Sequence, residues 1–321
     1  MSEAICTENL IFSLNATIPI FLLMLVGYVL HHKTRLLSDR FADDLNKYVF
    51  QIALPIQMFK SMAAADFHTV WNGKVVVFCC VVSLISILVM LGLSRFLRDR
   101  SIRAEFVQAG YRGSQALLGG ALLQNIYGNT RPLALILIGA VPIYNIAAVL
   151  VLMLMTPEGG HLDRKTIRKA VRGVVTNPLI LGILVGLVWS LLEIPQPTVM
   201  QRAVDSLAAT ATPMGLLALG ACIDWKKAVE CWKPTMVCCA FKLVIFTALF
   251  LPLAVWMGFR GEILVAVVIM LASPATVSCF SMARSMGHPG VLTSSTVMLT
   301  TVGSAFTFTF WLYLLKTLAL I

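Results

Sequence analysis

Long apolar stretches recur along the chain and are separated by short polar segments. A helix that crosses a lipid bilayer needs about 20 apolar residues, and windows of that length predict ten membrane spans. The predicted spans are 10–31, 41–63, 75–97, 103–127, 132–155, 171–192, 199–222, 233–257, 260–284 and 289–318. The sequence therefore predicts an all-α integral membrane protein with ten transmembrane helices.

The composition supports this fold class. Of the 321 residues, 59% are hydrophobic and only 12% are charged, whereas soluble domains are close to 25% charged. The first ten residues show no basic segment and no small-residue cleavage site, so we expect the first apolar stretch to remain as a helix. The net charge of +10 is better explained by basic loops on one side of a membrane than by a nucleic-acid partner, because no basic groove or motif accompanies it.

The placement of the basic residues predicts an orientation. The loops after the first, third, fifth and seventh spans carry three to five lysines and arginines each, and the alternate loops carry at most two. The positive-inside rule places the basic loops in the cytoplasm. Both termini are therefore expected outside.

The second half of the sequence resembles the first. The segments "PIFLLMLVGYVL" (19–30) and "PLILGILVGLVW" (178–189) match at six of twelve positions with an offset of 159 residues. The same offset places Ser114 on Ser273. One nearly constant offset across several pairs of spans is hard to obtain by chance, so we predict two copies of a five-span unit.

A unit of five spans is odd, so its second copy must enter the membrane from the opposite side. The sequence therefore predicts two inverted repeats, 1–155 and 171–321, joined by a cytoplasmic linker at 156–170. Inverted repeats are the architecture of many secondary transporters, which bind substrate near the membrane midplane at interrupted helices.

The fourth and ninth spans, at 103–127 and 260–284, are predicted to be interrupted. The fourth has Gly119 and Gly120 at its middle, which lower helix stability, and the ninth has Pro274, which removes a backbone donor. Irregular backbone at membrane depth is tolerated only where it is buried or lines a wet cavity. Two spans that cross at their breaks would direct free helix N-termini, which attract anions, into such a cavity. Close packing of helices through small residues is the alternative interpretation.

Polar side chains around these breaks are the candidate binding residues. Arg112 is the sharpest candidate, because an arginine within the membrane is costly, although its side chain could instead extend to the cytoplasmic interface. Asn145 would support the crossing or only bond to another helix, and Lys242 would face a cavity or pair with a carboxylate. The full candidate set is Arg112, Ser114, Gln115, Gly119, Gly120, Asn125, Asn145, Ser273, Pro274, Thr276 and Ser278.

Several kinds of chemistry are disfavoured by the sequence. No Asp or Glu lies well inside a predicted span, which argues against a carboxylate proton relay. The histidines and cysteines form no metal set, and the cysteines are interpreted as small apolar core residues. Neither HExxH nor GxSxG is present, so we expect neither an enzyme nor a bound cofactor.

A set of short motifs, in this order on ten spans, resembles the auxin efflux carrier family in its bacterial branch. The resemblance covers nearly the whole chain. Its motifs are "LNKYVFQIALP" (45–55), "RGSQALLGGALLQNIYG" (112–128), "VPIYN" (141–145), "TNPLILGILVGLV" (176–188), "LAATATPMGLLALGA" (207–221) and "SPATVSCFSMA" (273–283).

The resemblance implies a crossing of the fourth and ninth spans, a scaffold domain from spans 1, 2, 6 and 7, and a transport domain from the rest. It also implies a homodimer in the bacterial cytoplasmic membrane and an organic-anion substrate, such as auxin in plants or malonate and malate in bacteria. The sequence departs from the family pattern at Ser114, where relatives often have Asn, and at Ala121, where they often have Pro. The departure leaves the substrate open.

The function expected from these observations is secondary transport of a small organic anion by alternating access. Without a relay carboxylate, transport can follow the membrane potential, which favours export of an anion by about 2.3 kcal/mol per 100 mV. An anion-selective channel and an ion-coupled carboxylate symporter are the alternatives. A sensor is disfavoured because no soluble domain accompanies the spans.

Overall fold

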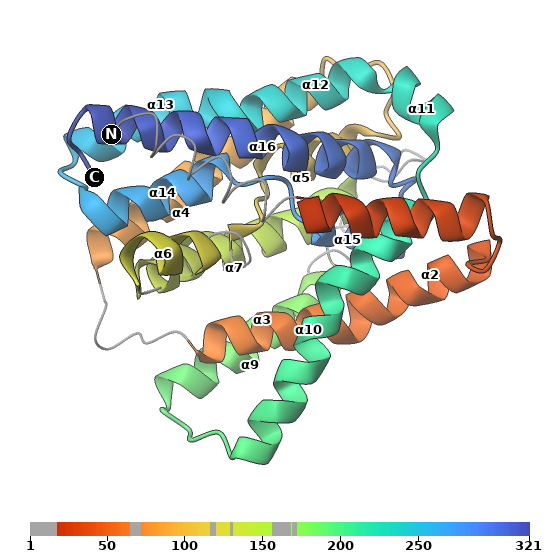
Figure 1. The fold of residues 1–321 in the computed structure, drawn as a ribbon, viewed down its shortest axis with the longest axis horizontal. Helices are drawn as coiled ribbons and strands as arrows, with labels where there is room; N and C mark the ends of the chain where they lie inside the picture. The colour runs from red at the N-terminus through yellow and green to blue at the C-terminus, as the bar shows by residue number, and fades with distance from the viewer. Residues whose placement is uncertain (1–17, 65–71, 116–119, 129–130, 156–167, 169–171) are drawn as a thin grey trace.

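The computed structural model describes residues 18–64, 72–115, 120–128, 131–155, 168 and 172–321 (Figure 1). The regular elements in this part of the chain are all helices. The first runs from Ile18 to His32. It is followed by α2 (Asp39–Tyr48), η1 (Val49–Ala53), α3 (Leu54–Ala63), α4 (Gly73–Ser94), α5 (Arg103–Tyr111), α6 (Gly120–Tyr127), α7 (Arg131–Leu154), α9 (Pro178–Leu191), α10 (Thr198–Ala221), α11 (Trp225–Glu230), α12 (Trp232–Ala240), η3 (Phe241–Ile245), α13 (Phe246–Trp256), α14 (Gly261–Ala272), α15 (Val277–Ser285) and α16 (Val291–Thr317).

Five helices among the described residues are long and apolar enough to cross a membrane. They are Gly73–Ser94, Pro132–Leu154, Thr198–Ala221, Trp232–Trp256 and Val291–Thr317, and the pair α14 and α15, bent by 40° at its break, makes a sixth. The chain is therefore a multi-pass membrane protein.

The ten predicted spans are not reproduced by length and composition alone. Pro178–Leu191 has only 14 residues. The predicted second span is a helix from Asp39 to Ala63 that opens with the polar segment DRFADDLNKY. The predicted fourth span is divided into α5 and α6. A hydropathy window averages across such turns and breaks, and so the count of ten stays a prediction.

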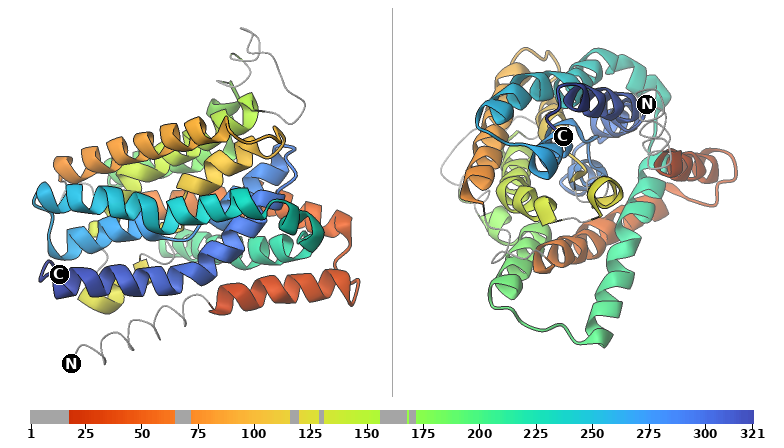
Figure 2. Two further views of the ribbon diagram at one scale, coloured as in Figure 1. Left: turned by 90° about the horizontal axis from the view of Figure 1, so that it is seen from above. Right: turned by 60° about the vertical axis from the view of Figure 1, so that its left-hand side comes forward.

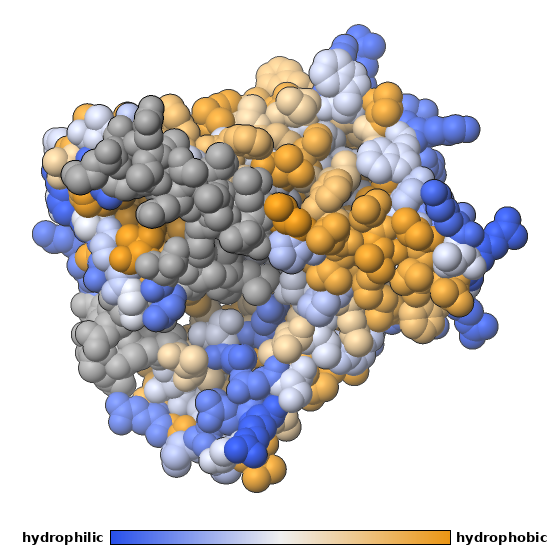
Figure 3. Space-filling view, viewed as in Figure 1, coloured by the Kyte–Doolittle hydropathy of each residue, from blue (hydrophilic) through white to orange (hydrophobic). Residues whose placement is uncertain are grey.

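Large apolar side chains lie exposed on the outer faces of the helices. Figure 3 shows a continuous apolar area over the helix Ile18–His32, where Phe21, Leu22 and Leu25 are exposed. Other exposed apolar residues include Val77, Leu84 and Leu88 of α4, Val185 and Val188 of α9, and Phe306 and Phe310 of α16. Soluble monomers rarely expose contiguous apolar areas of this kind, whereas lipid-facing helices require them.

The helices form two groups that meet at the centre of the molecule. The helix Ile18–His32, α2, α3, α9 and α10 pack together on one side, and α4, α5, α7, α12, α13, α14 and α16 form the other (Figures 1 and 2). Glycines allow close approach in the first group: a Cβ on Gly27 would overlap the backbone of Leu217, and one on Gly186 would lie 2.6 Å from the carbonyl oxygen of Phe59. Small residues at helix contacts are typical of membrane proteins.

A buried carboxylate joins α5 to the start of α16. Glu105 is the third residue of α5 and is fully buried. It accepts hydrogen bonds from the backbone N–H groups of Gly290 at 2.7 Å and Thr293 at 3.0 Å, and from the Thr293 hydroxyl at 3.1 Å. The first N–H groups of a helix have no partner within the helix, and a carboxylate satisfies them and the helix dipole. Glu105 lies at the start of the predicted span 103–127, and the structure shows that it is buried there and caps the N-terminus of α16.

Replacing Glu105 by glutamine is expected to destabilise the protein. An amide presents one NH₂ group where an acceptor oxygen now faces backbone donors, which leaves a buried N–H unpaired at a cost of about 1–3 kcal/mol. Thermal unfolding of the purified protein in detergent measures the loss. Glu230→Gln is the matched control, because Glu230 is exposed at the end of α11. Equal unfolding temperatures for the two variants would contradict this role of Glu105.

Candidate functional site

Two broken helices cross at the centre of the molecule. α5 ends at Tyr111 and residues 112–114 are not helical, while α14 ends at Ala272 and α15 begins at Val277. The two breaks are joined directly, since the backbone N–H of Ser114 donates to the carbonyl oxygen of Pro274 at 2.8 Å. The backbone group that would have continued α5 is thus satisfied by the opposite break, as membrane depth requires.

The first break begins earlier in the chain than the sequence predicted. It begins at Arg112, which has extended backbone angles (φ −75°, ψ 132°), and Gly120 is already the first residue of α6. A Cβ on Gly113 would overlap the hydroxyl of Ser273 in the other break, so glycine at this position allows the two breaks to approach closely.

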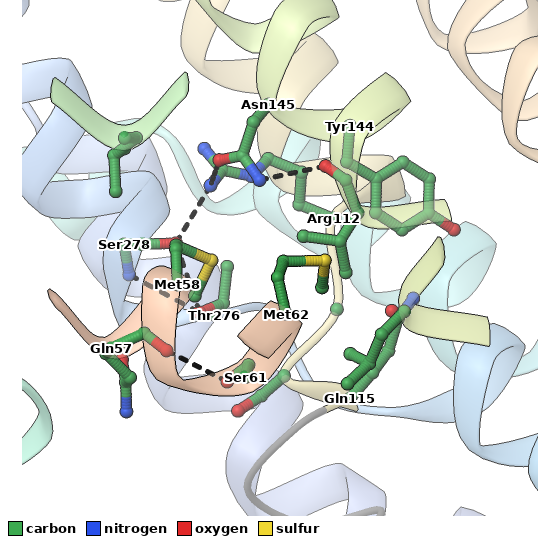
Figure 4. Close-up of a pocket in the computed structure, with 15 residues that line it drawn as sticks. Gln57, Met58, Ser61, Met62, Arg112, Gln115, Tyr144, Asn145, Thr276 and Ser278 are labelled. Atoms are coloured by element: carbon green, nitrogen blue, oxygen red, sulfur yellow. Dashed lines mark hydrogen bonds between the residues drawn. The ribbon is translucent and has the colours of Figure 1, made fainter. Parts of the chain in front are cut away.

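A small cavity of about 60 Å³ opens beside the crossing (Figure 4). A water molecule needs about 10–15 Å³ by the same measure, so the cavity holds several water-sized groups. Its lining comes from three places: α3, the two breaks, and α7 with one residue of α9. The lining residues are Gln57, Met58, Ser61, Met62, Arg112, Gly113, Ser114, Gln115, Leu137, Val141, Tyr144, Asn145, Leu179, Thr276 and Ser278.

Arg112 carries a buried positive charge to this cavity. Its side chain is 3% exposed, so it does not extend to the surface. One terminal nitrogen donates at 2.9 Å to both the Asn145 amide oxygen and the Ser278 hydroxyl, and the other donates at 3.4 Å to the Gln108 amide oxygen. All of these acceptors are neutral, and no carboxylate among the described residues lies within ion-pair distance of Arg112.

The start of α15 also faces the cavity. Thr276 is the residue before this helix, and its hydroxyl accepts a hydrogen bond from the backbone N–H of Ser278 at 3.4 Å. Both hydroxyls line the cavity and lie 3.2 Å apart. Helix N-termini carry partial positive charge and unpaired N–H groups, which favour an anion.

Gln115 contributes an unused polar group. The side chain is 2% exposed, and neither its amide nitrogen nor its amide oxygen has a hydrogen-bond partner in the described part of the chain. Buried polar groups in folded proteins are nearly always paired. This amide lies at the cavity wall (Figure 4).

The structure brings most of the predicted site residues together. Arg112, Ser114, Gln115, Asn145, Thr276 and Ser278 line the cavity. Ser273 and Pro274 are not among its lining residues and lie at the crossing itself, and Gly120 starts α6. Gly119 and the side chain of Asn125 lie outside the described residues.

Sequence reasoning missed the wall that α3 provides. Gln57 and Ser61 line the cavity from this helix, and the Ser61 hydroxyl donates to the Gln57 carbonyl oxygen at 2.9 Å. The two are four residues apart and so share one face of a helix. Polar residues at this spacing within an apolar span were a signal that could have found them.

Other polar residues have different surroundings. Lys242 is buried and bonds to backbone carbonyls rather than to a carboxylate. Arg284 pairs with Asp43 at 2.7 Å near the surface. The seven described cysteines are unpaired, and the described residues contain no group of three or more metal-binding side chains.

Membrane helices that break and meet around a polar cavity are typical of transport proteins. Comparison with known sequences agrees with this class: the family described as "Membrane transport protein" matches residues 12–312. The chain belongs to this family, which is of the auxin efflux carrier type. The resemblance expected from the short motifs is thereby confirmed, and family membership favours a transporter over an enzyme.

A relative in Rhizobium meliloti (strain 1021) is named "Putative malonate transporter". It is 25% identical to the chain over 313 residues, which cover 94% of this chain and 96% of the relative. The similarity therefore extends through both broken helices and the cavity between them.

Proposed function

We propose that the chain is a secondary transporter of a small organic anion, a mono- or dicarboxylate of the size of malonate or malate. The observation that carries this proposal is the guanidinium of Arg112, which is buried at the cavity and has only neutral partners in the described residues. A buried charge without a counter-charge is costly. A carboxylate substrate supplies the missing negative charge while it is bound.

The remaining lining of the cavity fits the same substrate class. The start of α15 and the amides of Gln115 and Gln57 can donate hydrogen bonds to carboxylate oxygens. The methionines Met58 and Met62 cover the carbon side of a small ligand. The name of the Rhizobium meliloti relative supports a dicarboxylate.

The proposed architecture is two inverted five-span repeats. Contacts related by the offset of 159 residues support it: Gly27 packs against α10, and its counterpart Gly186 packs against α3, the counterpart of α10. The breaks also correspond. With the offset of 159 residues, Tyr111, the last residue of α5, corresponds to Met270, which lies two residues before the end of α14.

The proposed mechanism is alternating access. We assign the group around α3 and α10 as scaffold and the group around the crossing as transport domain, because the cavity is lined by α3 on one side and the breaks on the other. Movement of one group against the other would expose the cavity to each side in turn. Both termini outside, a bacterial cytoplasmic membrane and a homodimer through the scaffold complete the proposal.

Flux into proteoliposomes tests the function. A potassium gradient with valinomycin sets the voltage, and the uptake of labelled malonate, malate, succinate and an aromatic acetate is followed. We expect saturable flux of at least one acid that follows the imposed voltage. Flux that does not saturate would identify a channel, flux that requires a sodium or pH gradient would identify a symporter, and no flux of any acid would contradict the proposal.

A further inference from the structure

A buried lysine, Lys242, lies next to the crossing but not among the residues that line the cavity. Lys242 is 1% exposed. It belongs to η3, a π-helical turn within the long helix Trp232–Trp256. Turns of this kind are frequent at functional sites. The described residues place no carboxylate within ion-pair distance of its amino group.

The amino group of Lys242 bonds to the end of a broken helix. It donates to the carbonyl oxygen of Leu271 at 3.1 Å and to that of Met270 at 3.3 Å. Both carbonyls belong to the last turn of α14, where helix carbonyls have no partner within the helix and the dipole is negative.

The break in the chain leaves these two carbonyls free. In an uninterrupted helix, the oxygen of Met270 would accept from residue 274, but Pro274 has no N–H. The oxygen of Leu271 would accept from the N–H of Ala275, which instead donates to the Thr300 hydroxyl at 3.0 Å. Lys242 therefore supplies the donors that the helix break removes.

The amino group of Lys242 also lies close to the break that follows α5. A Cβ placed on Gly113 would lie 2.9 Å from the Lys242 amino nitrogen. Ser273, in the other break, is fully buried and its hydroxyl has no partner among the described residues. The amino group of Lys242 thus lies where the C-terminal end of α14, the non-helical segment that follows it and the opposite break come together.

Transporters with broken helices use such places for their coupling ions, because unwound carbonyls and the C-terminal ends of half-helices coordinate Na⁺. We propose that the ammonium of Lys242 is a built-in cation that occupies the position of a coupling ion, so that anion transport by this chain needs no Na⁺. The inference rests on the proposed transport function. It predicts that removal of the amino group leaves a vacant cation site.

The vacant site can be tested without transport. Purified wild type, Lys242→Ala, Lys242→Met and the control Lys33→Ala, whose side chain is exposed, are unfolded thermally in N-methylglucamine, sodium or methylammonium chloride. Sodium or methylammonium is expected to raise the Tm of Lys242→Ala by about 2–4 °C, as a bound ligand does, and to leave wild type and Lys33→Ala unchanged. The same comparison is made for Lys242→Met in case Lys242→Ala does not fold. Equal shifts in all proteins, or no shift in any Lys242 variant that folds, would overturn the proposal.

Flux gives the second readout. Wild-type anion flux is expected to be the same in sodium and in N-methylglucamine. The flux of Lys242→Ala is expected to be about tenfold or more lower when no small cation is present, as for a lost bond to a charged group. Addition of sodium or methylammonium is expected to restore it. Sodium-dependent wild-type flux overturns the inference even if both variants fail to fold. Absence of wild-type flux would contradict the proposed function, and the Tm shift would still decide on Lys242.

Discussion

Replacing Arg112 by glutamine is expected to lower kcat/KM for the proposed anion transport by about 10- to 100-fold, the effect of losing a bond to a charged group. The reason is the absence of any carboxylate partner for this guanidinium in the described residues. In the proposed function, this charge pairs with the bound substrate instead of with a carboxylate of the protein. Initial rates in proteoliposomes over a range of anion concentrations measure the change.

The matched control for this variant is Arg98→Gln. It makes the same substitution at an exposed position, and its flux is expected to equal that of the wild type. The unfolding temperature of Arg112→Gln must be measured beside the flux, because Arg112 also bonds to Asn145 and Ser278. A folded Arg112→Gln protein with wild-type kinetics would contradict the assigned role.

Replacing Gly113 by alanine is expected to disrupt the crossing. The added methyl group would overlap the Ser273 hydroxyl and crowd the Lys242 amino group. Overpacking of a buried contact typically costs about 1–3 kcal/mol. We expect a lower unfolding temperature and a flux reduced by about tenfold or more, because the two breaks must move apart.

Gly92→Ala provides the comparison for Gly113→Ala. A Cβ on Gly92 meets no atom within 4 Å, and alanine is the better helix former inside α4. Its unfolding temperature and flux are therefore expected to be unchanged or slightly raised. If both glycine variants behaved alike, the close approach at the crossing would not constrain the protein.

The hydropathy pattern predicted where helices occur, because a span buried in lipid must be apolar along most of its length. It could not predict where α5 ends. No proline marks that position, and Gly113 is required only because the opposite break lies against it. Such a requirement arises from tertiary contact and has no local signal.

The candidate site was predicted to a large extent because polar side chains are expensive in a membrane and therefore stand out. Six candidates from the two breaks and α7 line the cavity. The contribution of Gln57 and Ser61 was not predicted, because both residues lie in α3, away from the two breaks that mark the site in the sequence. The partners of Lys242 could not have been predicted, because they are backbone carbonyls that become free only through the break.

The central claim is that the cavity at the crossing binds a small organic anion through the charge of Arg112. Equilibrium binding to the purified protein tests it most directly, with labelled malonate competed by unlabelled malonate, malate, succinate, an aromatic acetate or the neutral diamide of malonate. We predict saturable binding, displaced by at least one acid but not by the diamide, and weakened in Arg112→Gln but not in Arg98→Gln. Displacement by the diamide as effective as by malonate, or undiminished binding to a folded Arg112→Gln protein, would contradict the claim.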